Sequence, residues 1–125
     1  MVENDLIEEY LLSFAITQTT DYQIKSSVMK HNRAMNKCRR IASEIQTNYP
    51  GLKESFAQLL DKYPEMSLLV AHHIIEVMQY PDSIKSKALL IIKEKSKEDS
   101  SEGLGNKMWL KDYLKAHPKD KKLIR

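Results

Sequence analysis

The chain has 125 residues, enough for one domain that buries a working core. Its single cysteine, Cys38, excludes an internal disulfide and a cysteine-rich zinc site, and three glycines and four prolines disfavour a turn-rich sandwich or barrel. The net charge of +3 is unevenly spread, because residues 1–20 carry four acidic side chains and no Lys or Arg, whereas residues 104–125 carry seven basic and two acidic ones.

Apolar residues recur at steps of three and four along most of the chain, which is the period of an amphipathic helix. The predicted helices, in chain order, are residues 3–16, 22–47, 51–63, 65–80, 82–98 and 104–116. The Ser-rich stretch 99–103 is predicted to be a loop, and the mostly basic tail 119–125 is expected to fray.

Three Tyr-Pro pairs divide the middle of the chain, at Tyr49-Pro50, Tyr63-Pro64 and Tyr80-Pro81. Proline cannot continue a helix but can open one, so each pair is predicted to end one helix and begin the next. Short helices with wide apolar faces must pack against neighbours. We therefore predict a single all-α domain over residues 1–125, with about six helices stacked as antiparallel pairs, in a HEAT/ARM-like α-solenoid or a compact helical bundle.

The helix over 65–80 is apolar around about half its circumference, so we expect it to be central and covered on more than one side. Its remaining strip carries His72, His73, Glu76 and Gln79. His72 and Glu76 have the i, i+4 spacing of two metal ligands, but no other cluster supplies a third. A hydrogen-bonded pair on a surface strip is the competing interpretation.

The long helix over 22–47 has a continuous apolar seam that includes Ile24, His31 and Cys38. We interpret His31 as a core or boundary histidine with a hydrogen-bond partner, and Cys38 as a small buried hydrophobe. Outside the seam lies a basic face, which is the best nucleic-acid candidate in the chain and consists of Lys25, Arg33, Lys37 and Arg40.

Trp109 and Tyr113 lie one turn apart on the helix over 104–116. Exposed together they would anchor a protein partner, whereas packed inward they would close the end of a helical stack. No Gly-rich phosphate loop and no hydrolase or metalloprotease motif occurs, so we expect no enzyme, no bound metal and no cofactor.

Several short sequence pieces carry a family resemblance. They are Leu6-Ile7-Glu8-Glu9-Tyr10, His31-Asn32, Met35-Asn36-Lys37, Phe56-Ala57-Gln58-Leu59-Leu60, Val70-Ala71, Ala88-Leu89-Leu90 and Trp109-Leu110-Lys111-Asp112-Tyr113. With them the chain resembles small bacterial HEAT-like helical-repeat proteins that carry a domain of unknown function. Proteins of that kind often accompany toxin genes, as immunity proteins of polymorphic or contact-dependent growth-inhibition toxins.

The resemblance implies an immunity protein that binds one cognate toxin domain, such as a nuclease, and neutralises it by protein–protein contact. Contacts are expected at the strip of His72, His73, Glu76 and Gln79, and at the acidic first helix with Glu3, Asp5, Glu8 and Glu9. The alternative is a nucleic-acid-binding or regulatory helical protein that uses the basic face of Lys25, Arg33, Lys37 and Arg40.

The remaining expectations concern where the chain works. No stretch approaches the roughly 18 apolar residues of a membrane span, so no membrane partner is predicted. The acidic start is unlike a secretion signal, and together with the cysteine count it favours the cytoplasm. We expect a monomer or small oligomer.

Overall fold

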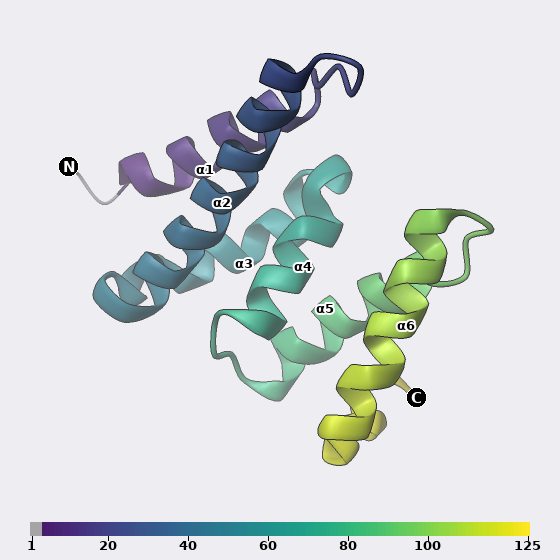
Figure 1. Ribbon diagram of the computed structural model, residues 1–125. Coiled ribbons are helices and arrows are strands. Elements are labelled where there is room, and N and C mark those ends of the chain that lie inside the picture. Colours follow the sequence, from purple (N-terminus) through teal and green to yellow (C-terminus); the bar gives the residue numbers. More distant parts are fainter. Residues whose placement is uncertain (1–3) are drawn as a thin grey trace. The chain divides into compact units, whose positions relative to one another are not determined.

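The computed structural model describes residues 4–125, and all regular structure within them is helical (Figure 1). It contains six α-helices and three 3-10 helices. The all-α prediction is confirmed. Where about six helices were expected there are seven, counting the seven-residue 3-10 helix near the C-terminus. The chain divides into two compact units, the first ending at Gln58 and the second running from Leu59 to Arg125.

The first unit is built on α1 (Asn4–Thr17) and α2 (Lys25–Asn48), which lie side by side and, joined by a short connection, run in opposite directions (Figure 1). The 3-10 helix η1 (Pro50–Leu52) and the start of α3 (Lys53–Lys62) complete it.

The core of the first unit centres on two aromatic rings and a thiol. Tyr10 and Phe56, both fully buried, meet edge to face with ring centroids 4.9 Å apart. Cys38 lies beside them, fully buried, with its Sγ 3.7 Å from the Tyr10 carbonyl oxygen. Burial raises the pKa of the Cys38 thiol to about 11, so the prediction of a small buried hydrophobe is confirmed.

The second unit contains two 3-10 helices and three α-helices after the end of α3. They are η2 (Pro64–Met66), α4 (Ser67–Glu76), α5 (Asp82–Lys95), α6 (Ser101–Ala116) and η3 (Pro118–Ile124). The helix α4 packs along α5, and α5 packs against α6 and η3. The Tyr-Pro breaks occur as predicted, because Pro50 opens η1, Pro64 opens η2 and Pro81 caps α5.

The central helix α4 is shorter than the predicted 65–80. Its last turn widens at His73, whose carbonyl accepts from the backbone N–H groups of both Val77 and Met78. Residues 77–81 then leave the helix as the chain approaches Pro81, before which the helical conformation is disfavoured. Its wide apolar face is buried, as expected, with Val70, Ala71 and Ile74 at 1% exposure or less.

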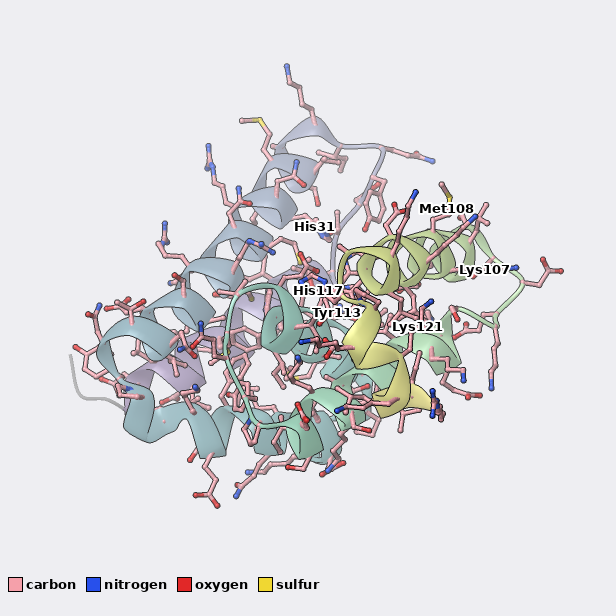
Figure 2. All side chains as sticks on the ribbon, turned by 90° about the horizontal axis from the view of Figure 1, so that it is seen from below. His31, Lys107, Met108, Tyr113, His117 and Lys121 are labelled. Atoms are coloured by element: carbon pink, nitrogen blue, oxygen red, sulfur yellow. The ribbon has the colours of Figure 1, made fainter. Side chains whose placement is uncertain are left out.

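The C-terminal tail corrects a second expectation. Instead of fraying, residues 118–124 form η3 and are held to α5 by two hydrogen bonds. Ser86 donates to the Leu123 carbonyl over 2.5 Å and Lys93 to the Ile124 carbonyl over 3.0 Å. Ile124 is 8% exposed. The tail was expected to fray because most of its residues are charged, but it also contains the apolar pair Leu123 and Ile124 just before Arg125. Just before η3, the rings of Tyr113 and His117 stack at 4.3 Å (Figure 2).

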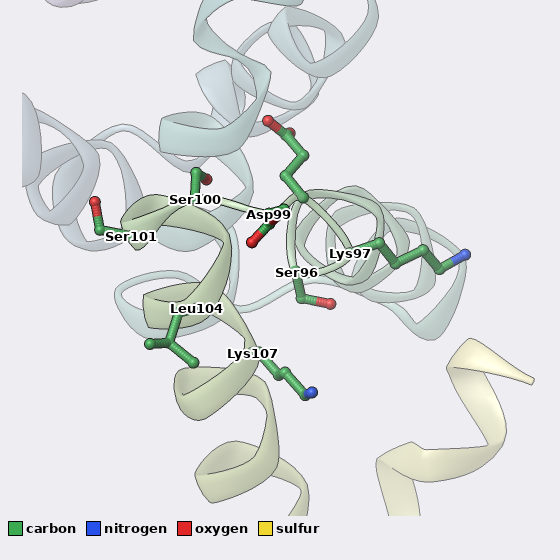
Figure 3. Close-up of a pocket in the computed structure, with 8 residues that line it drawn as sticks. Ser96, Lys97, Asp99, Ser100, Ser101, Leu104 and Lys107 are labelled. Atoms are coloured by element: carbon green, nitrogen blue, oxygen red, sulfur yellow. The ribbon is translucent and has the colours of Figure 1, made fainter.

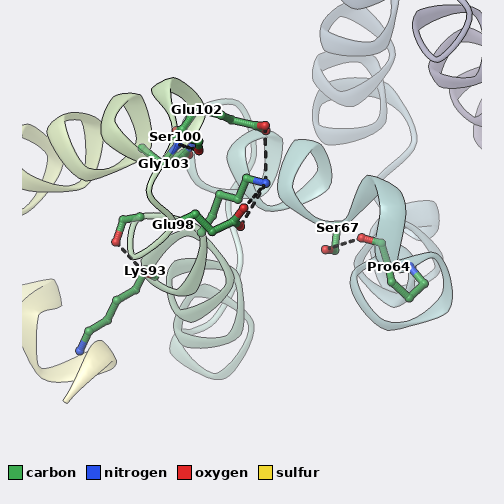
Figure 4. Close-up of polar contacts among 10 residues, drawn as sticks. Pro64, Ser67, Lys93, Glu98, Ser100, Glu102 and Gly103 are labelled. Carbon is green, nitrogen blue, oxygen red and sulfur yellow. Dashed lines mark hydrogen bonds and ion pairs between the residues drawn. The ribbon is translucent and has the colours of Figure 1, made fainter.

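The turn between α5 and α6 also differs from its prediction, because α6 begins at Ser101 and not at residue 104. An open hollow lies here, and Figure 3 shows Lys97 and Lys107 directing their side chains away from Ser100 and Ser101. The Ser100 hydroxyl caps α6 by accepting from the Gly103 N–H over 2.9 Å (Figure 4).

Gly103 explains why this turn is so tight. A Cβ atom added to it would press into the Glu98 carbonyl group at the end of α5, far inside van der Waals contact. The same turn is tied by Lys95, whose Nζ lies 3.1 Å from Glu98 and 3.5 Å from Glu102 (Figure 4). The glycine that signalled a loop in the sequence is therefore a packing requirement inside a helix.

Candidate protein-binding face

The predicted strip on α4 is not a free surface. His73 is 4% exposed and belongs to the core, which corrects its placement on an outward strip. The helical wheel placed it outward because the wheel takes account only of the apolar residues of α4 itself. It does not show how much of α4 the neighbouring helices cover. Glu76 and Gln79 are exposed, but α4 ends at Glu76, so Gln79 does not continue its face.

His72 is committed to contacts inside the second unit. Its Nδ1 lies 2.8 Å from the Glu76 carboxylate, so the predicted hydrogen-bonded pair is confirmed. Its Nε2 donates to Asn106 Oδ1 over 2.7 Å, and the Asn106 amide is held in this orientation because its Nδ2 donates to the Glu102 carbonyl. The ring also meets Trp109 edge to face at 4.6 Å.

Trp109 and Tyr113 stack on each other, with ring centroids 5.1 Å apart and planes 6° apart, and both are half-buried. The Tyr113 hydroxyl donates to Asp120 over 2.6 Å, and Lys85 approaches the same carboxylate to 2.9 Å. Burial alone would raise the pKa of Asp120, but these two contacts lower it overall. The aromatic pair therefore joins α6 to η3 and α5.

The acidic first helix has two carboxylates that form no ion pair with any residue the structure describes. Asp5 and Glu8 are exposed, while Glu9 lies 3.7 Å from Lys37 of α2. Glu3 lies outside the described residues. Lys37 of the predicted basic face is therefore paired with Glu9.

The outer surface of α2 is the clearest candidate for a binding face. On a helix at 100° per residue, five side chains fall within one stripe about 80° wide over residues 25–40. We call this the α2 outer face, and it consists of Lys25, Met29, Arg33, Asn36 and Arg40. Lys25, Arg33 and Arg40 make no ion pair with any of residues 4–125, and Met29 is 45% exposed between them.

Two further apolar side chains adjoin the start of this face. Tyr22 is 72% and Ile24 is 50% exposed, although the apolar period had placed Ile24 in the buried seam. Asp21 explains the difference, because its carboxylate accepts from the Gln23 N–H and its carbonyl from the Ile24 N–H. This turn delays α2 until Lys25 and holds Ile24 outside the helix.

The corner below Tyr22 is fixed by His31. The Thr20 hydroxyl donates to the Thr17 carbonyl, and it therefore accepts from His31 Nδ1 over 2.8 Å. The Tyr22 ring packs against the imidazole with centroids 5.8 Å apart. The interpretation of His31 as a hydrogen-bonded boundary histidine is confirmed. The exposed Tyr22 and Ile24 therefore adjoin a turn that is held by hydrogen bonds.

Three further properties bear on the chemistry. Within residues 4–125, no three His, Cys, Asp or Glu side chains gather closely enough to hold a metal ion. No helix in the described chain has the length and apolar character that crossing a bilayer requires. Every buried side-chain nitrogen or oxygen among these residues has a hydrogen-bond partner.

Comparison with known proteins does not assign a family. The chain matches no protein-family model, no curated protein and no solved structure. The resemblance to HEAT-like proteins therefore stays a prediction.

Proposed function

We propose that this chain binds another protein through the α2 outer face and the adjoining Tyr22 and Ile24, and that its partner is a toxin domain whose activity it blocks. The observation that supports protein binding is the exposure of Tyr22, Ile24 and Met29 beside cations that have no ion-pair partner in the described part of the chain. The choice of a toxin comes from the resemblance of the short sequence pieces to immunity proteins.

The composition of this surface favours a protein partner. Tyr, Met and Arg are enriched in protein interfaces, and apolar side chains surrounded by charge are typical of binding sites. The face is formed by a long helix and a hydrogen-bonded corner, so binding requires no ordering of the backbone, although its long side chains lose rotational freedom. Because Lys25, Arg33 and Arg40 make no ion pair among residues 4–125, the complementary surface of the toxin is acidic.

The test is co-expression with the product of the neighbouring gene, followed by affinity purification and a growth-protection assay. We expect a stable complex, and we expect Ile24→Ser with Met29→Ser to weaken it by about tenfold or more through lost apolar burial. Lys25→Glu with Arg33→Glu should weaken it similarly and slow association.

The matched control is Lys111→Glu with Lys115→Glu, which changes net charge equally but alters α6. If no neighbouring product co-purifies, or if the α2 variants protect as well as the wild type, the proposal is wrong.

A second candidate is nucleic-acid binding, favoured by the row of Lys25, Arg33 and Arg40 along one stripe. Phosphate contacts by these cations would give binding to DNA or RNA that weakens steeply with salt. The two candidates separate cleanly, because Ile24→Ser with Met29→Ser should impair protein binding and leave phosphate contacts unchanged.

A further inference from the structure

Two helices, one near each end of the chain, expose faces of opposite charge. On α1, Asp5, Glu8 and Leu12 share one outward stripe, and Leu12 is 61% exposed. On α6 the outward stripe consists of Leu104, Lys107, Met108, Lys111 and Lys115. We call these the α1 acidic stripe and the α6 basic stripe.

The α6 basic stripe combines charge with exposed apolar surface. Leu104 is 57% and Met108 is 59% exposed, and Figure 2 shows Lys107 and Met108 projecting outward from α6. None of the stripe's lysines forms an ion pair within residues 4–125, and neither do Asp5 and Glu8 of the α1 acidic stripe. Both stripes therefore have unmatched charge beside unmatched apolar surface.

We propose that the α6 basic stripe of one copy of this chain binds the α1 acidic stripe of a second copy. The proposal rests on charge complementarity and on matching spacing. It is independent of the α2 outer face and of the proposed function.

The spacing fits an antiparallel pair of helices. With Leu12 opposite Met108, the axial rise places Glu8 at about 6 Å and Asp5 at about 10.5 Å along α1. On α6, Lys111 then lies at about 4.5 Å and Lys115 at about 10.5 Å from Met108. Both carboxylates meet an ammonium group in one register, while the apolar side chains cover each other.

The same arrangement also agrees with the helix dipoles. An antiparallel pair sets Asp5, in the first turn of α1, against Lys115, in the last turn of α6, where each charge already suits its own helix end. The apolar contact is needed as well, since exposed ion pairs by themselves contribute little to association.

The test is sedimentation velocity of the full chain from about 10 µM to about 1 mM at low salt, a range suited to a small interface. We expect the average mass to rise with concentration. Near 0.5 M salt, we expect the dissociation constant of the association to be about tenfold larger. Asp5→Lys with Glu8→Lys should remain monomeric, and so should Lys111→Glu with Lys115→Glu.

Mixing these two variants is the decisive experiment. One retains the native α6 basic stripe and the other the native α1 acidic stripe, so an equimolar mixture should associate although neither variant does alone. Lys25→Glu with Arg33→Glu, with the same charge change as the α6 variant, should associate like the wild type. Leu12→Ser, which keeps all charges, should weaken association about tenfold.

A wild type that stays monomeric over the whole range overturns the proposal, and so does a mixture that fails to associate. Circular dichroism of each variant establishes that it is folded. If a charge-reversed chain does not fold, the single substitution Leu12→Ser, at an exposed position, tests the same contact. Association of that variant at the wild-type strength would then overturn the proposal.

Discussion

The two units use their polar residues differently. In the second unit, His72 and Asn106 join α4 to α6, and Asp120 joins η3 to α5 and α6. In the first unit, Lys25 and Arg33 remain in solvent along α2. His72, Asn106 and Asp120 therefore connect helices of the second unit, whereas Lys25 and Arg33 make no ion pair among residues 4–125. Substitutions of His72, Asn106 or Asp120 should therefore reduce stability, whereas substitutions of Lys25 and Arg33 should leave it nearly unchanged.

The largest effect is expected at Gly103. Replacing it with Ala places a methyl group against the Glu98 backbone, which cannot rotate away, so α6 must shift from α5. We expect the free energy of unfolding to fall by about 3 kcal/mol, measured by urea denaturation.

Gly105 is the matched control, since nothing lies within 4 Å of an added Cβ there. Gly105→Ala should raise stability by about 0.5–1 kcal/mol through helix propensity. Equal effects at both glycines would show that close packing at Gly103 is not what holds the turn.

The next effect concerns the link between α4 and α6. Asn106→Leu removes the acceptor of His72 Nε2 and the donor to the Glu102 carbonyl in a buried position. We expect a loss of about 2 kcal/mol in unfolding free energy. A double-mutant cycle with His72→Leu should recover part of it, and strict additivity would contradict the link.

A smaller effect, dependent on pH, is expected at Asp120. Its pKa is held below the ordinary 3.8, so its ionised form stabilises the folded state above that value. The stabilisation is lost as pH falls through the lowered pKa. Asp120→Asn should cost about 1 kcal/mol at neutral pH, and the difference from wild type should shrink in acid. A constant difference from pH 7 to the acid limit would contradict this.

The smallest effect on stability is expected on the α2 outer face. Lys25→Glu with Arg33→Glu should change the unfolding free energy by less than about 0.5 kcal/mol, because both side chains lie in solvent. Thermal denaturation checks this, and a large loss would mean that these cations also stabilise the first unit.

The sequence was sufficient to predict the six α-helices, because apolar period and proline position are local signals, but not η3 or the observed ends of α4 and α6. It could not predict the burial of His73 or the exposure of Ile24, since the first depends on neighbouring helices and the second on the Asp21 turn. For the candidate site, it identified the cations of α2. It missed Tyr22 and Met29, because exposed apolar residues carry no periodic signal.

The buried thiol of Cys38 has a practical consequence. It is the only cysteine, it is inaccessible in the folded first unit, and its raised pKa keeps it protonated near neutrality. An alkylating reagent should therefore modify the chain only when that unit opens. The only tryptophan, Trp109, lies in the second unit, so fluorescence follows the other half. Cysteine modification and tryptophan fluorescence can therefore follow the opening of the two units separately in the unlabelled chain.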